Sequence, residues 1–278
     1  MLAATIATLP FKIPVAHLHG GESTEGAIDE AIRHSITKMS HIHFTSTEFY
    51  RERVMRMGEN PKLVYNTGSV SLDNLESEAS LSKDQLEKEL DFKLEEKCLL
   101  ATLHPVTLEF ENTRWHAQQW LKAIACANIQ TIVTYPNADT HGSIIIEEIK
   151  KAAAENKNIK IVMNLGKKRY FSMMKYCQAM IGNSSSGIIE SASFKLPVIN
   201  IGNRQRGRIH SFNVIDVGHS YEEIEMGIKT ALSSEFKESL KDLKNPYVNG
   251  IASKKMVDIL ETVPLNLQLI EKKFYDGL

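Results

Sequence analysis

The chain has 278 residues and a net charge of −1, with 33 Lys and Arg against 34 Asp and Glu. Hydrophobic residues make up 42% and charged residues 24%, the balance of a folded globular protein rather than a disordered or fibrous one. Because a near-neutral chain has no overall basic field, we expect neither nucleic acid nor a membrane surface as its partner.

The three cysteines are Cys98, Cys126 and Cys177. They are odd in number and never form a C-x-x-C pair, which argues against a disulfide framework and a zinc cluster and favours a reducing, cytoplasmic setting. The apolar first ten residues lack a basic start and a small-residue cleavage site, so they predict a helix and connector rather than a signal peptide. No run approaches the ~18 apolar residues of a membrane span.

The first part of the chain alternates β-rich runs with amphipathic stretches. Strands are predicted at Ile13–His19, His41–Thr45 and Lys62–Asn66. Between the first two, Ile28, Ile32 and Ile36 recur at helical spacing and predict a helix over residues 27–39.

Residues 75–96 differ in composition, being dense in Glu, Lys, Asp and Ser around sparse leucines. This pattern is typical of a solvated helix and linker. Six further strands are predicted after it, at Lys97–Leu103, Thr131–Tyr135, Ile159–Asn164, Ala179–Gly182, Pro197–Ile201 and Asn213–Val217. Amphipathic stretches over residues 113–127 and 143–155 predict helices between them.

Repeated β-α alternation predicts parallel sheets covered on both faces, so we expect an α/β fold with two Rossmann-like domains. Residues 1–96 are predicted to form an N-terminal, catalytic domain with its linker. That domain is incomplete, since it holds three strands and resembles the back half of a doubly wound domain. Residues 97–245 are predicted to form a complete C-terminal domain, and residues 246–278 to form helices that pack back toward the first. Ligands are expected beyond the carboxyl ends of the strands.

The segment Gly182–Glu190 reads GNSSSGIIE, a buried strand that ends in a Ser/Gly turn and opens a helix. Such a turn offers backbone N–H groups, hydroxyls and the positive end of a helix dipole, a combination that binds phosphate. Glu190, about one turn later, is placed to accept hydrogen bonds from ribose hydroxyls. The alternative is a plain serine N-cap.

The segment Asn200–Arg208 carries three arginines and two glycines at the end of the next strand. Arginines in a flexible loop can close over a diphosphate through bidentate contacts. The alternative is a solvated basic loop.

Two further polar groups follow neighbouring strands of the second domain. His104 precedes Pro105, which fixes the turn, and is a candidate to bind a phosphate oxygen or transfer a proton. Asn137 occupies the equivalent place one strand later and can contact a base, ribose or phosphate. The alternatives are a histidine satisfied by backbone and a simple turn asparagine.

In the first domain, HLHGGE at residues 17–22 ends a strand, and period two places His17 and His19 on one face. Glu22, Asp29 and Glu30 add carboxylates suited to removing or supplying a proton. A divalent metal is the rival use of these groups, but no H-x-x-x-H spacing supports it, and we expect none. The two acidic residues that open the following helix also suit its first turn. His41 and His43, which alternate in a predicted strand, are interpreted as structural.

Together these segments resemble the UDP-N-acetylglucosamine 2-epimerase family, most closely its hydrolysing branch in sialic-acid-type biosynthesis. The resemblance covers essentially the whole chain and rests on motifs in the family's order: HLHGGE, IDEAIRH, LHPVT, YPNAD, GNSSSGIIE and NIGNRQRGR. It implies two Rossmann-like domains of the glycosyltransferase B type, no cofactor, and a homo-oligomer, either dimer or tetramer.

The resemblance also implies a mechanism. A base removes the C2 proton of the N-acetylhexosamine while UDP leaves C1, and water adds to the resulting glycal to give free N-acetylmannosamine and UDP. Carried over, the diphosphate lies against Ser184, Ser185, Ser186 and Gly187, the ribose against Glu190, and the phosphates against Arg204. His104 stabilises the leaving group. Asp29 matches a catalytic carboxylate. His19 stands where some members have a catalytic glutamate, and either His19 or the nearby Glu22 takes that glutamate's part in proton transfer.

Family members carry roughly another hundred residues before this point, including a Gly-Asp-Arg-x-Glu motif, so we expect an N-terminally truncated member. Three functions therefore stay open. The chain is a hydrolysing UDP-N-acetylglucosamine 2-epimerase acting on that or a related UDP-acetamido sugar, a catalytically inactive UDP or UDP-sugar-binding protein, or a retaining glycosyltransferase. The motifs HLHGGE and GNSSSGIIE disfavour the last.

Overall fold

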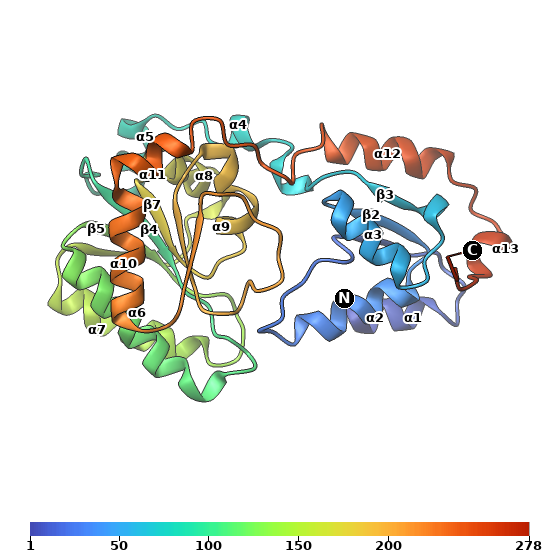
Figure 1. The fold of residues 1–278 in the computed structure, drawn as a ribbon, viewed down its shortest axis with the longest axis horizontal. Helices are drawn as coiled ribbons and strands as arrows, with labels where there is room; N and C mark the ends of the chain where they lie inside the picture. The colour runs from blue at the N-terminus through green and yellow to red at the C-terminus, as the bar shows by residue number, and fades with distance from the viewer. Residues whose placement is uncertain (278) are drawn as a thin grey trace. The chain divides into compact units, whose positions relative to one another are not determined.

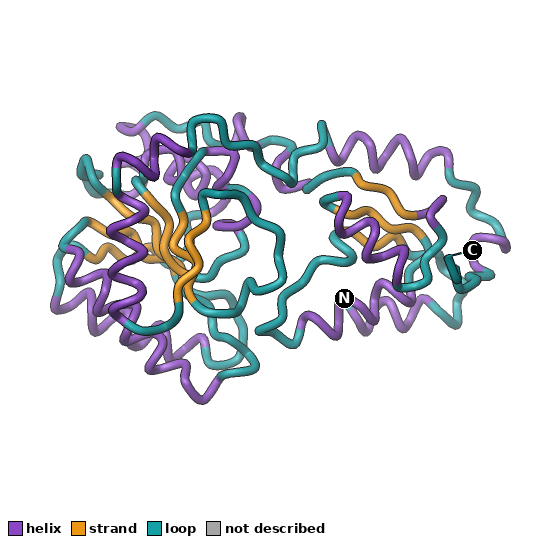
Figure 2. The backbone as a smooth tube through the Cα atoms, viewed as in Figure 1, coloured by secondary structure: helices purple, strands orange, loops and turns teal. Residues whose placement is uncertain are grey.

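The computed structural model describes residues 1–277 and divides into two compact units (Figures 1 and 2). Unit 1 comprises Met1–Thr24, Ile28–Asp73 and the chain from Pro246 onward. Unit 2 comprises Glu25–Ala27 and Asn74–Asn245. Within residues 1–277, no helix is both long enough and apolar enough to cross a bilayer.

Unit 2 is built on a six-stranded sheet with the order β6-β5-β4-β7-β8-β9 and parallel pairing throughout. Its strands are β4 Cys98–Thr102, β5 Gln130–Thr134, β6 Ile159–Val162, β7 Ala179–Gly182, β8 Val198–Ile201 and β9 Val214–Val217. Counted within the unit this is the order 3-2-1-4-5-6 of a doubly wound Rossmann sheet. The switch point lies between β4 and β7, where ligands of such sheets bind.

Helices cover both faces of this sheet (Figure 1). They are α4 Leu75–Glu78, α5 Lys83–Leu90, α6 Thr113–Ala127, α7 Gly142–Glu155, α8 Gly166–Tyr176, α9 Ser186–Ile189, α10 Tyr221–Leu232 and α11 Ser234–Ser239, with 3-10 turns η3 Phe110–Asn112 and η4 Ser191–Phe194. Alternate strand residues such as Leu99 and Ile181 pack with Trp120 and Ile124 of α6 in one core. Helices α8 and α9 lie against the strands elsewhere in the unit.

Unit 1 has a three-stranded parallel sheet of order β1-β2-β3, formed by Ala16–Leu18, Ile42–Thr45 and Val64–Asn66. Its helices are α1 Leu2–Thr8, α2 Asp29–Met39, α3 Glu48–Arg56, α12 Ala252–Thr262 and α13 Leu267–Ile270, with 3-10 turns η1 Pro61–Leu63 and η2 Val70–Leu72. Figure 2 shows the strands of each unit flanked by its helices.

The C-terminal helices are tied to unit 1 by apolar and polar contacts. Met256 of α12 and Leu269 of α13 pack with Ile42 and Phe44 of β2. The carboxylate of Asp73 accepts hydrogen bonds at 2.7 and 2.6 Å from the first two N–H groups of α12, a position where a negative charge is favoured.

All nine predicted strands form, most of them one to three residues shorter than predicted. The unit boundary falls after Asp73, however, and not after residue 96 as the composition suggested. Residues 74–96 belong to unit 2 because this segment packs on α8: the Leu81 N–H donates to Ser172 Oγ, and the Leu81 carbonyl accepts from the Tyr176 hydroxyl. Sparse leucines in a charged segment thus mark a buried contact.

Candidate functional site

A cavity of about 470 Å³ opens in unit 2 at the carboxyl ends of β4, β5, β6 and β7. Its polar lining includes five residues predicted from the sequence, His104, Asn137, Ser184, Ser186 and Glu190. It also includes Thr102, Thr134, Asn164, Lys167 and Tyr170, which were not predicted. Its apolar wall is formed by Tyr135, Pro136, Met163, Leu165 and Phe171. An apolar wall facing a few converged polar groups is the usual composition of a small-molecule site.

The end of β7 can form this wall because Gly182 lies against β4. Its φ of 142° is reached readily only by glycine, and a Cβ atom there would lie 1.8 Å from the carbonyl oxygen of Thr102. The next residue, Asn183, is fully buried and bonds both backbone groups of His104, accepting from its N–H at 2.7 Å and donating to its carbonyl at 2.9 Å. The ends of two neighbouring strands are thereby fixed together.

The serine turn is organised by a chain of hydroxyl groups. Ser184 Oγ lies 2.9 Å from Ser186 Oγ, which lies 2.6 Å from the hydroxyl of Tyr170 on α8. Burial raises the pKa of Tyr170 to about 12, so its hydroxyl stays protonated as a hydrogen-bond donor. Tyr170 was not predictable as a site residue, because no local sequence pattern links it to a turn 16 residues later.

The helix expected after the turn is short. Helix α9 covers four residues and passes directly into η4, so its macrodipole contributes less than a long helix would. Glu190 stands at the junction, is 8% exposed and lines the cavity. Hydroxyl and carboxylate groups therefore carry most of the polar character of this wall.

Two residues predicted in the turn lie outside the cavity lining. Gly187 donates its N–H to the Ser184 carbonyl, and a Cβ atom on it would lie 2.9 Å from Val198 Cγ1, so this glycine permits close packing on β8. Ser185 is half-buried, and its carbonyl accepts the N–H groups of Ile188 and Ile189. Both residues shape the turn.

His104 is held in one neutral form. Burial, followed by the nearby charge of Arg204, lowers the pKa of His104 to about 4. Its Nδ1 atom lies 3.1 Å from both the backbone N–H and the side-chain Oδ1 of Asn137. With Nδ1 accepting the backbone N–H, the proton of the neutral ring is on Nε2. The ring is thus prepared to donate one hydrogen bond without carrying a charge at pH 7.

The arginine loop contacts the serine turn from the side. Arg204 Nη1 donates to the Asn183 carbonyl at 3.2 Å, and the Gln205 amide donates to the same carbonyl at 2.8 Å. Arg204 Nη2 also lies 3.8 Å from Asp139 Oδ2. Arg206 instead pairs with Glu25 at 2.7 Å. Of these two arginines, Arg204 is the one placed beside the turn.

Unit 1 brings two of its predicted residues together. Glu22 is 1% exposed, and its Oε1 atom lies 2.7 Å from His19 Nδ1 and accepts the Ser46 hydroxyl at 2.7 Å. His19 has a φ of 62°, in the left-handed region that a non-glycine residue adopts only when its surroundings hold it there. A carboxylate, an imidazole and a hydroxyl are thus held in contact, an arrangement suited to proton transfer.

The expectation that His17 and His19 share one face of a strand is wrong. Strand β1 ends at Leu18, and the left-handed backbone of His19 breaks the alternation. His17 lies inside, 3.1 Å from the Thr37 hydroxyl, and burial lowers its pKa to about 4. His43, interpreted as structural, is fully buried and bonds Glu59 at 2.9 Å.

The predicted carboxylates that open α2 lie in different surroundings. Asp29 is exposed in the first turn of α2. Glu30 accepts the Thr24 N–H at 2.6 Å and the Ser23 hydroxyl at 2.9 Å, and it lies 3.1 Å from His34 Nε2. Burial raises the pKa of Glu30, but these hydrogen bonds outweigh it and the net pKa is lowered. Glu30 therefore anchors the chain leading into α2.

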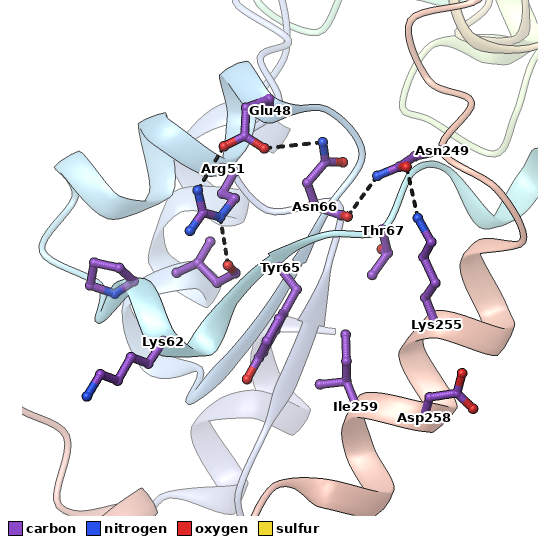
Figure 3. A pocket seen from close by; sticks show the side chains of 12 residues that line it. Glu48, Arg51, Lys62, Tyr65, Asn66, Thr67, Asn249, Lys255, Asp258 and Ile259 are labelled. Carbon is purple, nitrogen blue, oxygen red and sulfur yellow. Dashed lines mark hydrogen bonds and ion pairs between the residues drawn. The ribbon is translucent and has the colours of Figure 1, made fainter.

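A second cavity, of about 550 Å³, lies in unit 1 beside β3 and α12 (Figure 3). Arg51 pairs with Glu48 at 2.8 Å, and Lys255 donates to Asn249 at 2.8 Å. The other charged residues of its lining are Lys62 and Asp258. No sequence motif was assigned to this region.

Known proteins are similar in sequence to both units of this chain. The sequence model of a family described as UDP-N-acetylglucosamine 2-epimerase matches residues 1–261. A GDP/UDP-N,N'-diacetylbacillosamine 2-epimerase (hydrolyzing) from Campylobacter jejuni is 43% identical over 86% of this chain. A UDP-N,N'-diacetylbacillosamine 2-epimerase (hydrolyzing) from Legionella pneumophila is 38% identical over 98% of it. The chain spans 62% of the first protein's length and 71% of the second's.

Solved structures share the fold at lower sequence identity. The UDP-GlcNAc 2-epimerase from Neisseria meningitidis bound to UDP-GlcNAc gives a TM-score of 0.82 at 20% identity, covering 94% of this chain and 73% of that one. The MnaA protein of S. aureus with UDP gives 0.79 at 17% identity, covering 100% and 74%. These likenesses confirm the predicted α/β fold of the glycosyltransferase B type.

Proposed function

The chain belongs to the UDP-N-acetylglucosamine 2-epimerase family, and from that premise we propose that it acts as a hydrolysing UDP-acetamido-sugar 2-epimerase. It converts its substrate to the free 2-epimer and UDP. The observation that carries the proposal is the cavity of unit 2, where the sequence-predicted groups His104, Asn137, Ser184, Ser186 and Glu190 converge.

In this proposal the cavity holds UDP. The apolar wall around Leu165 and Phe171 suits a uracil ring, and Glu190 accepts hydrogen bonds from the ribose hydroxyls. Ser184 and Ser186 donate to the diphosphate, and Arg204 supplies positive charge beside the same turn. The Nε2–H of His104 stabilises the oxygen that becomes negative as UDP leaves.

The proton at C2 of the sugar is removed by unit 1. His19 and Glu22 share one hydrogen bond, so the buried carboxylate orients the ring and stabilises it when it takes up a proton. Asp29 is exposed and free to approach a substrate. Loss of the C2 proton and of UDP from C1 leaves a double bond, to which water adds to release the sugar.

Two UDP-sugars are candidate substrates. The relatives from C. jejuni and L. pneumophila, which are 43% and 38% identical to this chain, are named as 2-epimerases of UDP-N,N'-diacetylbacillosamine. A Neisseria meningitidis relative named UDP-N-acetylglucosamine 2-epimerase is 30% identical. We therefore propose UDP-N,N'-diacetylbacillosamine as the preferred substrate over UDP-N-acetylglucosamine.

A direct assay tests the proposal. The chain is incubated with each UDP-sugar separately, and UDP and the free 2-epimer are quantified by chromatography. We expect both products, with a higher kcat/KM for the diacetamido sugar. Release of UDP without a free 2-epimer, or turnover only after an acceptor sugar is added, contradicts the proposal.

A second candidate is a UDP-binding protein without turnover. One observation favours it: the cavity is built wholly from unit 2. In that case UDP and the UDP-sugars bind with the same Kd, and neither UDP-sugar is consumed.

A further inference from the structure

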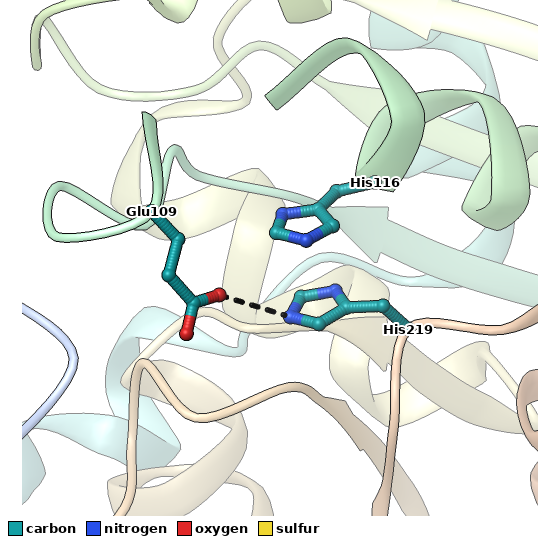
Figure 4. Close-up of side chains that lie close together, drawn as sticks. All are labelled: Glu109, His116 and His219. Atoms are coloured by element: carbon teal, nitrogen blue, oxygen red, sulfur yellow. Dashed lines mark ion pairs between the residues drawn. The ribbon is translucent and has the colours of Figure 1, made fainter. Parts of the chain in front are cut away.

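Three side chains in unit 2 that take no part in the proposed function lie close together. Glu109 precedes η3, His116 is on α6, and His219 follows β9 (Figure 4). Their donor atoms all lie within 4.8 Å of one another. Of these atoms, His219 Nε2 lies 3.9 Å from Glu109 Oε2.

The imidazole of His219 lacks the partners that a buried polar group needs. Within residues 1–277, neither of its ring nitrogens has a hydrogen-bond partner, although both are shielded from solvent. Its ring stacks on that of His116 with 3.5 Å between centroids and 7° between planes. An imidazole buried with both nitrogens unsatisfied is unfavourable, which indicates that a further group belongs at this place.

The two rings offer ligand atoms of a type that metals bind. A neutral imidazole keeps one nitrogen lone pair that a metal ion can accept. The carboxylate of Glu109 adds one negative charge. This carboxylate accepts a hydrogen bond from the side-chain amide of Asn203.

We propose that Glu109, His116 and His219 form a binding site for a transition-metal dication of the Zn²⁺ class. Two imidazoles and one carboxylate are a donor set that zinc accepts, whereas Mg²⁺ and Ca²⁺ prefer oxygen ligands alone. Three protein ligands leave a fourth position for water.

The arrangement needs a small change to bind the ion. Tetrahedral zinc with bonds of 2.0–2.1 Å places its ligand atoms about 3.3 Å apart. The three donors, which lie up to 4.8 Å apart, must therefore approach one another by at most about 1.5 Å, and the stacked rings must turn so that one nitrogen of each points to a common centre. Rotation of the Glu109 side chain, which is about one-third exposed, supplies part of this movement.

A bound ion would join three segments that are distant in the sequence. It would link the loop after β4, the start of α6 and the turn after β9. Glu109 also holds Asn203, the residue before Arg204, and a Cβ atom on Gly202 would lie 2.1 Å from His219 Nε2. The site is thus positioned to fix the arginine loop.

Metal titration of the full chain tests the site. The protein is freed of metal with a chelator, carries Cys126→Ser to remove the exposed thiol, and is titrated with Zn²⁺ by calorimetry and with Co²⁺ by visible absorption. We expect one ion per chain and the absorption of four-coordinate Co²⁺ without thiolate bands. His219→Ala and Glu109→Gln should each weaken binding at least about tenfold, since even outer partners of metal ligands are worth roughly 10–100-fold.

His141→Ala is the matched control, because His141 also stacks on an aromatic ring, that of Phe110, in the same unit. Metal affinity should be unchanged in that variant. Far-UV circular dichroism and UDP affinity, measured without metal, verify that each variant is folded. Glu109→Gln keeps the shape of the side chain, so it remains a test of metal binding if His219→Ala does not fold. Absence of stoichiometric binding, or equal affinity in folded Glu109→Gln and unmodified chains, overturns the site whether or not UDP binds.

Discussion

The hydroxyl of Tyr170 lies 2.6 Å from Ser186 Oγ, and through Ser186 it is joined to Ser184 at 2.9 Å. A residue of α8 thereby sets the orientation of two serines that line the cavity of unit 2. Because the pKa of Tyr170 is raised to about 12 by burial, this hydrogen bond persists across the neutral range.

Removing this hydroxyl should weaken UDP binding without unfolding the chain. Tyr170→Phe leaves Ser186 free to rotate, and we expect a loss of about 0.5–1.5 kcal/mol, the net worth of one hydrogen bond. Calorimetric titration with UDP measures it. Tyr176→Phe is the control, since its hydroxyl lies on the same helix and bonds the Leu81 carbonyl away from the cavity. Equal effects of the two variants would show that Tyr170 acts only on stability.

Glu190→Ala should reduce UDP affinity more strongly. A carboxylate that accepts ribose hydroxyls makes charge-assisted hydrogen bonds, and their loss is worth on the order of 1.5–3 kcal/mol. Glu148→Ala is a control of similar burial, 7% against 8% exposed, at a residue that does not line the cavity. An unchanged UDP affinity in Glu190→Ala would remove this residue from the nucleotide site.

Glu22→Gln should separate turnover from binding. The glutamine keeps the shape of the buried side chain but removes the charge beside His19 Nδ1, so proton transfer loses roughly 10²–10⁴ in rate. UDP affinity should not change, because unit 2 provides the proposed nucleotide cavity. The readouts are kcat for release of the free sugar and the Kd of UDP. Retention of full kcat would exclude Glu22 from the chemistry.

The stability of unit 2 should fall as the pH is lowered from about 6.5 to about 4. The folded pKa of His104 is lowered to about 4 by burial, so the unfolded chain binds more protons in this window and unfolding is favoured. His104→Gln should lose less unfolding free energy between pH 7 and pH 5 than the unmodified chain. Urea unfolding followed by the fluorescence of the buried Trp120 measures this difference.

His210 provides a control, because its effect on the pH dependence of stability has the opposite sign. Its hydrogen bond with Asp216, at 3.2 Å, raises its pKa, so its contribution to stability is complete at low pH and is lost as the pH rises. His210→Gln should therefore reduce stability more at pH 5 than at pH 8. The same slope in both histidine variants would contradict the assignment of the pH effect to His104.

Glu59→Gln should destabilise unit 1. This carboxylate is 2% exposed and accepts from His43, Lys38 and Lys272, and although burial opposes ionisation, these bonds lower its pKa to about 2. We expect a loss of about 3 kcal/mol, the low end for a buried pair, because Lys38 keeps 39% exposure and Lys272 keeps 24%. Unfolding monitored by circular dichroism tests this. Glu52→Gln, whose surface pair with Arg56 is exposed, is the control and should change stability little.

Much of the architecture was predictable because it is local in origin. Runs such as Ala179–Gly182 are apolar, β-rich and bounded by turn residues, so their strand conformation and the position of the serine turn follow from the residues themselves. The strand pattern also placed His104 and Asn137 just after strand ends, and Glu190 about one turn beyond the serine turn, where a parallel sheet brings side chains to one edge.

Other features were decided by packing between distant segments. Tyr170 reaches Ser186 because α8 packs against β4 and against η4, which follows the serine turn. Glu109, His116 and His219 meet because the loop after β4, the start of α6 and the turn after β9 come together. The assignment of residues 74–96 to unit 2 depends likewise on the contact of Leu81 with α8. Sequence patterns report the conformation of a segment and the face it buries. The three-dimensional path of the chain determines which buried groups become neighbours, and that path is known only from the tertiary structure.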